Sequence, residues 1–477
     1  METISRILCF LNKWVPLITQ RIMPMPVLLL SVQIMAFPAD DEYSKLIASG
    51  FSHGKTGDFE AAIADYTSAI AIDPDKVNGY YYRGTAKIKT GDFKSAILDF
   101  TKSIELKPDY ADAYLNRGYS KSCRKDQVGA IQDYNKAIEL KPDYAVAFAD
   151  RGHSKSIIGD RDGAIQDYSK AIKLKPDYAE AYEYRSRVEY EKRDKESAFL
   201  DLNKSIEINP KFVLAYHDRG YIKSYHGDQD GSIVDFNKAI ELKPNLAVAY
   251  LCRGNSKSII GDRDGAFSDI NKAIELQPKS SHGYLMRSKV KNRNKDFECA
   301  LLDANKAIEL DPNNPYVYFR LGLTHYDSGK YEESLDDFMK CKVYEESNHL
   351  FSDYSWFRTW LNRDRLSGEN AAIQELLDSK TKGKISLSSK WQVAIFRYLS
   401  NQIDEQSLIT TAKNNDPMTE KENLCEAYFY SGTRLLISGK TPDAIEHFKK
   451  CVSTGIIYYE EYDSAQAELS HMSAPAK

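Results

Sequence analysis

A proline recurs every 34 residues through most of this chain of 477 residues. The series runs Pro74, Pro108, Pro142, Pro176, Pro210, Pro244, Pro278 and Pro312. The stretch SKSIIGDRDGA also occurs twice, at 154–164 and 256–266, and the two copies lie three periods apart. A fixed period of this length is the sequence signature of an array in which each unit packs chiefly on its neighbours. The chain is therefore expected to fold as a row of similar units.

Other residue types keep the same phase. If the recurring proline is position 32, the first unit begins at Tyr43. Position 23 is then aspartate in nine successive units, position 20 is alanine or serine, position 8 is glycine or serine, and position 4 is aromatic from the second unit onward. Apolar or small residues at positions 17, 20, 21, 24, 27 and 28 form one stripe of a helix. Each unit is predicted to be two helices joined by a turn, with the proline ending the second helix.

This pattern resembles the tetratricopeptide repeat (TPR), in which an aromatic residue, a glycine, a later Ala-x3-aromatic and a closing proline recur with this period. The resemblance implies an all-α fold, a right-handed superhelical solenoid of helix-turn-helix units. It covers 43–346 as nine tandem units and 425–458 as one further TPR-like unit. The phase is lost in 347–424, which is predicted to be an irregular helical segment. The remainder, 459–477, is predicted to be a closing helix and tail.

The duplicated stretch is explained by its place in the unit. It spans the end of the first helix, the turn and the start of the second helix, so Asp160 and Asp262 are expected to cap second helices. A calcium loop of the EF-hand kind needs alternating oxygen ligands before its glycine and a glutamate at its twelfth position. Gly163 comes too early for that spacing. No metal site is predicted.

Position 7 of units two to eight is arginine, where TPR units commonly have a large apolar residue. These residues are Arg83, Arg117, Arg151, Arg185, Arg219, Arg253 and Arg287. The two end units have Ser49 and Leu321 instead, although they keep the position-23 aspartates Asp65 and Asp337. Position 11, often aromatic in TPR units, is frequently lysine. We predict that each position-7 arginine pairs with the position-23 aspartate between packed helices, as a structural contact.

The N-terminal residues 1–39 differ from the rest of the chain. Three cations, Arg6, Lys13 and Arg21, precede the apolar run Pro26–Phe37, and Ala39 follows it. This order resembles a secretory signal peptide, and the apolar run is short for a transmembrane helix. The alternative is a membrane-anchoring interfacial helix. We expect the protein to be exported to the periplasm or cell envelope if this segment is cleaved, and otherwise to be membrane-anchored, with membrane contact through this segment only.

Composition and motifs exclude several function classes. Lys and Arg number 65 against 69 Asp and Glu, a formal net charge of −4, which provides no basic field for nucleic acid. The 7 cysteines are scattered, so they indicate neither a disulfide framework nor a zinc site. The chain has no H-E-x-x-H, G-x-S-x-G, P-loop or Rossmann glycine pattern. We therefore expect a protein that is not an enzyme, with no cofactor and no small-molecule substrate.

A second, narrower resemblance lies in 315–470. After the repeats come YSWFRTWLNRDRLSGENAAIQELL, WQVAIFRYL and then LCEAYFYSGTRLLISGKTPDAIEHFKKCV. This order resembles the C-terminal half of NlpI-type bacterial envelope TPR lipoproteins. The resemblance implies an envelope adaptor that binds peptidoglycan-processing enzymes or proteases through the inner surface of the array. This chain has more repeats and no lipobox cysteine.

In TPR proteins the inner face of the array is lined by positions 2, 5, 9 and 12 of the first helices, which fall on one stripe. Aromatic and polar residues at and beside these positions suit a peptide or a partner helix. The candidate partner-binding groove consists of Tyr81, Tyr119, Glu183, Arg187, Tyr190, His217, Tyr221, Tyr225 and Asn255, and Lys289 continues the stripe in unit eight. A different interpretation is that the tyrosines only cover a wetted surface. Position 5 carries no lysine in the nine units, so recognition of a chaperone tail is not predicted.

Three functional interpretations follow from the sequence. The first is an exported scaffold or adaptor whose groove binds a partner peptide or protein. The alternative is a cytoplasmic or membrane-anchored TPR scaffold for assembly of a multiprotein complex. The third, a catalytic subunit with an unrecognised site, is disfavoured by the missing motifs. Self-association into a homo-oligomer stays open, because long solenoids have apolar ends.

Overall fold

The computed structural model describes residues 41–344, 352–387, 389–456 and 459–473. All regular elements in these ranges are α-helices, so the predicted all-α helical repeat fold is confirmed. The described chain forms two compact units that divide between Asp218 and Arg219. We call them the N-terminal unit and the C-terminal unit. The proposed leader, 1–39, lies outside the described residues, and within them no helix is both long and apolar enough to span a membrane.

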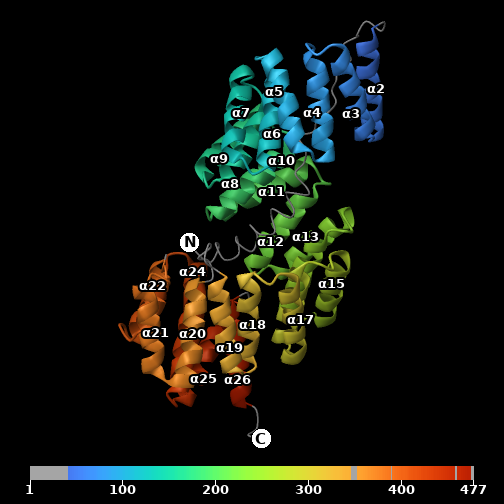
Figure 1. Cartoon of the computed structure of the whole chain (residues 1–477). Coiled ribbons are helices and arrows are strands. Elements are labelled where there is room, and N and C mark those ends of the chain that lie inside the picture. Colours follow the sequence, from blue (N-terminus) through green and yellow to red (C-terminus); the bar gives the residue numbers. More distant parts are fainter. Residues whose placement is uncertain (1–40, 345–351, 388, 457–458, 474–477) are drawn as a thin grey trace. The chain divides into compact units, whose positions relative to one another are not determined.

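Nine helix pairs follow one another along the array (Figure 1). They are α2 (Glu42–Thr56) with α3 (Phe59–Ile72), α4 (Val77–Thr90) with α5 (Phe93–Leu106), α6 (Ala111–Cys123) with α7 (Gln127–Leu140), α8 (Ala145–Ile157) with α9 (Arg161–Leu174), α10 (Ala179–Glu191) with α11 (Lys195–Ile208), α12 (Val213–Tyr225) with α13 (Gln229–Leu242), α14 (Ala247–Ile259) with α15 (Arg263–Leu276), α16 (Ser281–Arg293) with α17 (Phe297–Leu310), and α18 (Pro315–Asp327) with α19 (Tyr331–Val343). First helices of successive pairs also contact one another, as α6 does α8 and α8 does α10.

Seven more helices complete the C-terminal unit. They are α20 (Ser352–Ser367), α21 (Glu369–Thr381), α22 (Lys390–Leu399), α23 (Glu405–Ala412), α24 (Pro417–Ile437), α25 (Thr441–Ser453) and α26 (Glu460–Ser473). An apolar core that includes Phe357, Trp360 and Phe429 joins them to α18 and α19. In the α24–α25 pair, Gly432 lies against Phe448, as most position-8 glycines lie against an aromatic residue at position 24.

The turn within each of the first eight repeat pairs is set by an aspartate cap on the second helix and by close packing. Asp160 and Asp262 accept hydrogen bonds from the backbone N–H of Gly163 and Gly265, both at 2.9 Å, so the predicted capping role is confirmed. Close packing explains the glycine at position 8. A Cβ on Gly118 would lie 2.8 Å from the ring of Tyr134, so only a residue without a side chain lets the two helices approach this closely.

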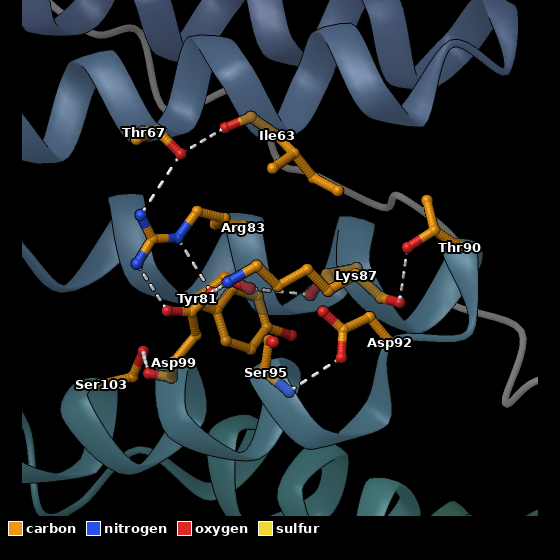
Figure 2. Close-up of polar contacts among 11 residues, drawn as sticks. Ile63, Thr67, Tyr81, Arg83, Lys87, Thr90, Asp92, Ser95, Asp99 and Ser103 are labelled. Carbon is orange, nitrogen blue, oxygen red and sulfur yellow. Dashed lines mark hydrogen bonds and ion pairs between the residues drawn. The ribbon is translucent and has the colours of Figure 1, made fainter.

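The predicted arginine–aspartate contact is present and extends to a third helix (Figure 2). Arg83 donates from Nε and Nη2 to the carboxylate of Asp99 at 3.0 and 2.7 Å, and Lys87 lies 2.8 Å from the same carboxylate. The remaining Nη1 donates to Thr67 at 3.3 Å, on the second helix of the preceding pair. Asp99 is only 4% exposed. One arginine therefore fastens both helices of its own unit and the unit before it.

All seven position-7 arginines bind their position-23 aspartates, which confirms the prediction. The pairs are Arg83–Asp99, Arg117–Asp133, Arg151–Asp167, Arg185–Asp201, Arg219–Asp235, Arg253–Asp269 and Arg287–Asp303. The position-11 lysines, which the sequence analysis left unassigned, bind the same aspartates in six of these units. In the end units, histidines at position 11 replace the cations: His53 lies 2.8 Å from Asp65, and His325 lies 2.6 Å from Asp337.

Replacing Arg151 by leucine tests this contact. We expect Arg151→Leu to lower the free energy of unfolding by about 1–3 kcal/mol, because it leaves the buried Asp167 with Lys155 as its one remaining cation. Urea unfolding followed by circular dichroism measures the loss. Lys136→Ala, which removes an exposed pair with Glu139, is the control and should cost about 0.5 kcal/mol or less. If Arg151→Leu leaves the free energy of unfolding unchanged or raises it, the contact is not needed for stability.

Two glycine-to-alanine changes test the close packing. Gly118→Ala should destabilise by about 1–3 kcal/mol, because its methyl group meets the ring of Tyr134. Gly54→Ala should instead stabilise by about 0.5–1 kcal/mol, because Gly54 lies within helix α2 and nothing is close to the added methyl group. Thermal unfolding of the two variants checks the opposite signs, and equal shifts would contradict the packing argument.

Candidate functional site

The nine predicted groove residues divide between the two compact units. Six are in the N-terminal unit: Tyr81, Tyr119, Glu183, Arg187, Tyr190 and His217. Three are in the C-terminal unit: Tyr221, Tyr225 and Asn255. The role of these residues in partner binding stays a prediction.

Most of the predicted tyrosines are packed side chains. Tyr81, Tyr119, Tyr190 and Tyr225 are each less than a tenth exposed. The hydroxyl of Tyr81 accepts a hydrogen bond from Asn116 at 3.1 Å, and the hydroxyl of Tyr225 donates to Glu422 at 2.8 Å. These tyrosines therefore pack between helices, and their part in partner binding stays a prediction.

Three of the predicted residues in the N-terminal unit do come together, around a carboxylate that was not predicted. Nε of Arg187 on α10 lies 2.5 Å from Oε1 of Glu183 on the same helix and 2.7 Å from Oδ2 of Asp218 on α12. Nδ1 of His217 lies 2.9 Å from the other oxygen of Asp218. Glu183 and His217 are 0% and 2% exposed. We call Glu183, Arg187, His217 and Asp218 the charged cluster.

Burial and neighbouring charges shift the pKa values of the two carboxyl groups of the charged cluster in opposite directions. Burial raises the pKa of Glu183 well above its usual range, and Arg187 offsets only part of that effect. Burial also acts to raise the pKa of Asp218, but Arg187 and His217 outweigh it and hold that pKa below its usual range. Burial therefore favours the protonated form of Glu183, and Arg187 favours the ionised form of Asp218. The protonated carboxyl group can serve as a hydrogen-bond donor.

The structure adds Asp150 and His153 on α8, two residues that the sequence analysis did not assign to the site. Oδ2 of Asp150 is buried and accepts no hydrogen bond, and burial raises the pKa of this carboxyl group to about 7. Burial lowers the pKa of His153 to about 4, with Arg187 adding to the effect, so this imidazole is neutral at physiological pH. Asp150 occupies position 6, the position of Asp218, and comparing that position between units could have found both aspartates.

In the C-terminal unit, helix α26 contacts cations carried by two first helices. Asp463 on α26 accepts from Nε of Arg293 at 2.9 and 3.0 Å, and Glu460 pairs with Arg320 and lies 3.8 Å from Lys289. These three cations come from the first helices α16 and α18. Lys289, which the sequence analysis placed on the inner face, is therefore in contact with α26. From α20, Arg358 and Arg365 bind Glu461 and Glu468 of the same helix.

The described side chains form no grouping of three or more His, Cys, Asp or Glu placed to hold a metal ion. What the charged cluster and Asp150 offer instead is hydrogen bonding and charge on successive first helices of one array. Such arrays present extended surfaces that bind other proteins or peptides. The geometry therefore supports recognition through noncovalent contacts.

Stacked helix pairs of this kind define a helical repeat protein. A family model described as TPR repeat matches residues 55–91, 158–185 and 295–329. A second family model, described as tetratricopeptide repeat, matches residues 81–145. A third model with the same description matches residues 213–246 and 315–344. The chain therefore contains tetratricopeptide repeats, in the N-terminal unit as in the C-terminal unit.

Solved structures of other repeat proteins are similar to parts of the chain. MamA is 27% identical, over 35% of this chain and 92% of its own, with a TM-score of 0.33. A tetratricopeptide repeat protein from Parabacteroides merdae is 21% identical, over 59% and 98%, with a TM-score of 0.39. YrrB, described as a TPR protein with an unusual peptide-binding site, is 21% identical, over 38% and 98%, with a TM-score of 0.32. No curated protein sequence matches the chain.

Asp150 makes a pH-dependent contribution to stability that can be measured. Its pKa is higher in the folded chain than in the unfolded chain, so the folded state binds the proton more tightly and stability falls as pH rises from about 4 to about 7. Asp150→Asn should therefore stabilise the protein at pH 8, by on the order of 2 kcal/mol, and have little effect at pH 4.5. Urea unfolding at the two pH values gives the difference. Asp143→Asn, an exposed change just before α8, should show no such pH dependence.

Proposed function

We propose that this protein is a non-enzymatic adaptor that binds a partner protein or peptide through the first helices of its N-terminal unit. The main support is a local break in the repeat pattern. Position 5 is apolar or aromatic in the other units, with Leu115, Ala149, Leu251 and Leu285 among its residues, but it is Glu183 and His217 in units five and six. Buried ionisable groups cost stability, and departures of this kind from a repeat's own rule are expected at functional sites.

The C-terminal unit supports this assignment by contrast. Its cationic first-helix residues, Lys289, Arg293 and Arg320, are engaged by α26. The charged cluster has its polar atoms on first helices of the N-terminal unit. A partner that inserts a polar side chain there meets a guanidinium already oriented by two carboxyl groups, so little order has to be created on binding.

We further propose that the adaptor is exported. The support is the order of cations, apolar run and Ala39 in residues 1–39, together with the resemblance of 315–470 to NlpI-type envelope proteins. On this proposal the partner is an envelope protein. Mapping the N-terminus of the protein from its source cell tests export: a chain that begins at Asp40 supports it, and an intact Met1 contradicts it.

A restoring double variant tests the binding surface. Glu183→Leu with His217→Leu gives units five and six the residue that units three, seven and eight carry at position 5, so folding should be kept. The immobilised full chain and this variant are exposed to envelope and cytosolic extracts. We expect the partner to be retained by the full chain and at least about tenfold less by the variant, because buried polar contacts dominate such recognition.

The control for this capture is Lys204→Ala with Glu207→Ala, which removes an exposed pair on α11 and should retain the partner fully. Circular dichroism establishes that each variant is folded. Equal retention by the full chain and the Leu variant would place the binding surface elsewhere and contradict the assignment.

A further inference from the structure

Asp150 is a carboxylate without a counter-charge. Its Oδ2 is buried and accepts no hydrogen bond, while the residue as a whole keeps part of its surface accessible. Other aspartates of the N-terminal unit are satisfied: Asp112 accepts from the hydroxyl of Tyr144 at 2.6 Å, Asp167 binds Arg151, and Asp218 binds Arg187. Asp150 therefore differs from these three aspartates of the N-terminal unit.

The groups around Asp150 supply rings, hydroxyls and a thiol, and Arg187, which affects the pKa of Tyr168 and His153 nearby, does not affect that of Asp150. Its charge raises the pKa of six neighbouring groups after the larger effect of burial: Tyr119 and Cys123 on α6, Tyr134 on α7, Tyr144 before α8, Tyr168 on α9, and Tyr178 before α10. All six are neutral at physiological pH. His153, one turn further along α8, is neutral there as well. No cation lowers the pKa of Asp150, which burial alone raises to about 7.

We infer that Asp150 and the tyrosines around it form a recognition site for a cationic side chain, lysine or arginine, carried by the partner. The inference rests on the proposed function and specifies the chemistry of the partner at this point. An ionised carboxylate that has lost its water gains a strong charge-assisted hydrogen bond from an ammonium or guanidinium group. Aromatic rings add attraction for the cation when their faces turn toward it.

The same chemistry makes recognition depend on pH. Below the pKa of Asp150 the carboxyl group is neutral and offers little to a cation. Above that pKa it is ionised, and the bound cation removes the cost of keeping an unpaired charge in the site. Binding of a cation should therefore strengthen between pH 5.5 and pH 8, in the direction opposite to the stability of the free chain.

Three capped amino acids serve as probes: N-acetyl-lysine amide, N-acetyl-arginine amide and the neutral N-acetyl-norleucine amide. Carboxyl signals of the full chain labelled with ¹³C-aspartate are followed by NMR, and Asp150→Asn identifies the signal of Asp150. We expect saturable binding of one or both cationic probes that is about tenfold tighter at pH 8 than at pH 5.5. Asp150→Asn should remove this pH dependence, and Asp143→Asn should preserve it.

Each contrary result has a definite meaning. Equal binding of the norleucine probe, unchanged binding to Asp150→Asn, or no saturable binding at pH 8 would overturn the inference. Partner capture separates this failure from failure of the proposed function. If the partner is lost with the Glu183→Leu, His217→Leu variant but kept by Asp150→Asn, the proposed function is supported and the cation site is contradicted. If the cationic probes bind but capture of the partner does not depend on the charged cluster, the cation site is supported and the proposed function is contradicted.

Discussion

The contact between the position-7 arginine and the position-23 aspartate organises the array. Each arginine uses its planar fork on one buried carboxylate. A further hydrogen bond to the second helix of the preceding unit is made by Arg83, Arg117, Arg151, Arg185, Arg253 and Arg287. A guanidinium is suited to this because it presents several donors in a fixed geometry. The apolar stripes alone would allow units to slide on one another. A recurring polar contact with strict geometry fixes the same register at each of these junctions.

Much of the fold was predictable from the sequence, because a period of 34 residues constrains all units at once. The helix caps at Asp160 and Asp262 and the arginine–aspartate pairs followed from residue type and spacing, and the structure confirms them. The contacts of His53 and His325 were not predictable in this way, because these histidines occur only in the two end units, where the lysine pattern at position 11 is broken.

The candidate site was less predictable, for a physical reason. A helical stripe says which positions share a face, but not whether a tyrosine there is covered by the next helix, as Tyr81 is. It also gives no sign that one carboxylate is paired and another is not. Asp150 and Asp218 occupy the same position of different units, and only the three-dimensional arrangement shows that Arg187 neutralises the second. The repeat pattern determines the fold of this protein, and the residues that depart from the pattern determine the chemistry of the candidate site.

The contacts of α26 have a consequence for the order in which the chain folds during synthesis. In the N-terminal unit, contacts join residues a single repeat apart, such as Tyr43 and Gly79, which are 36 residues apart in sequence. The fully buried Arg358 has its carboxylate partner 103 residues later, and Arg293 finds Asp463 after 170. Loops of that length close late. During synthesis the repeats of the N-terminal unit can therefore form early, while Arg293 and Arg358 stay unpaired until the residues of α26 have been translated.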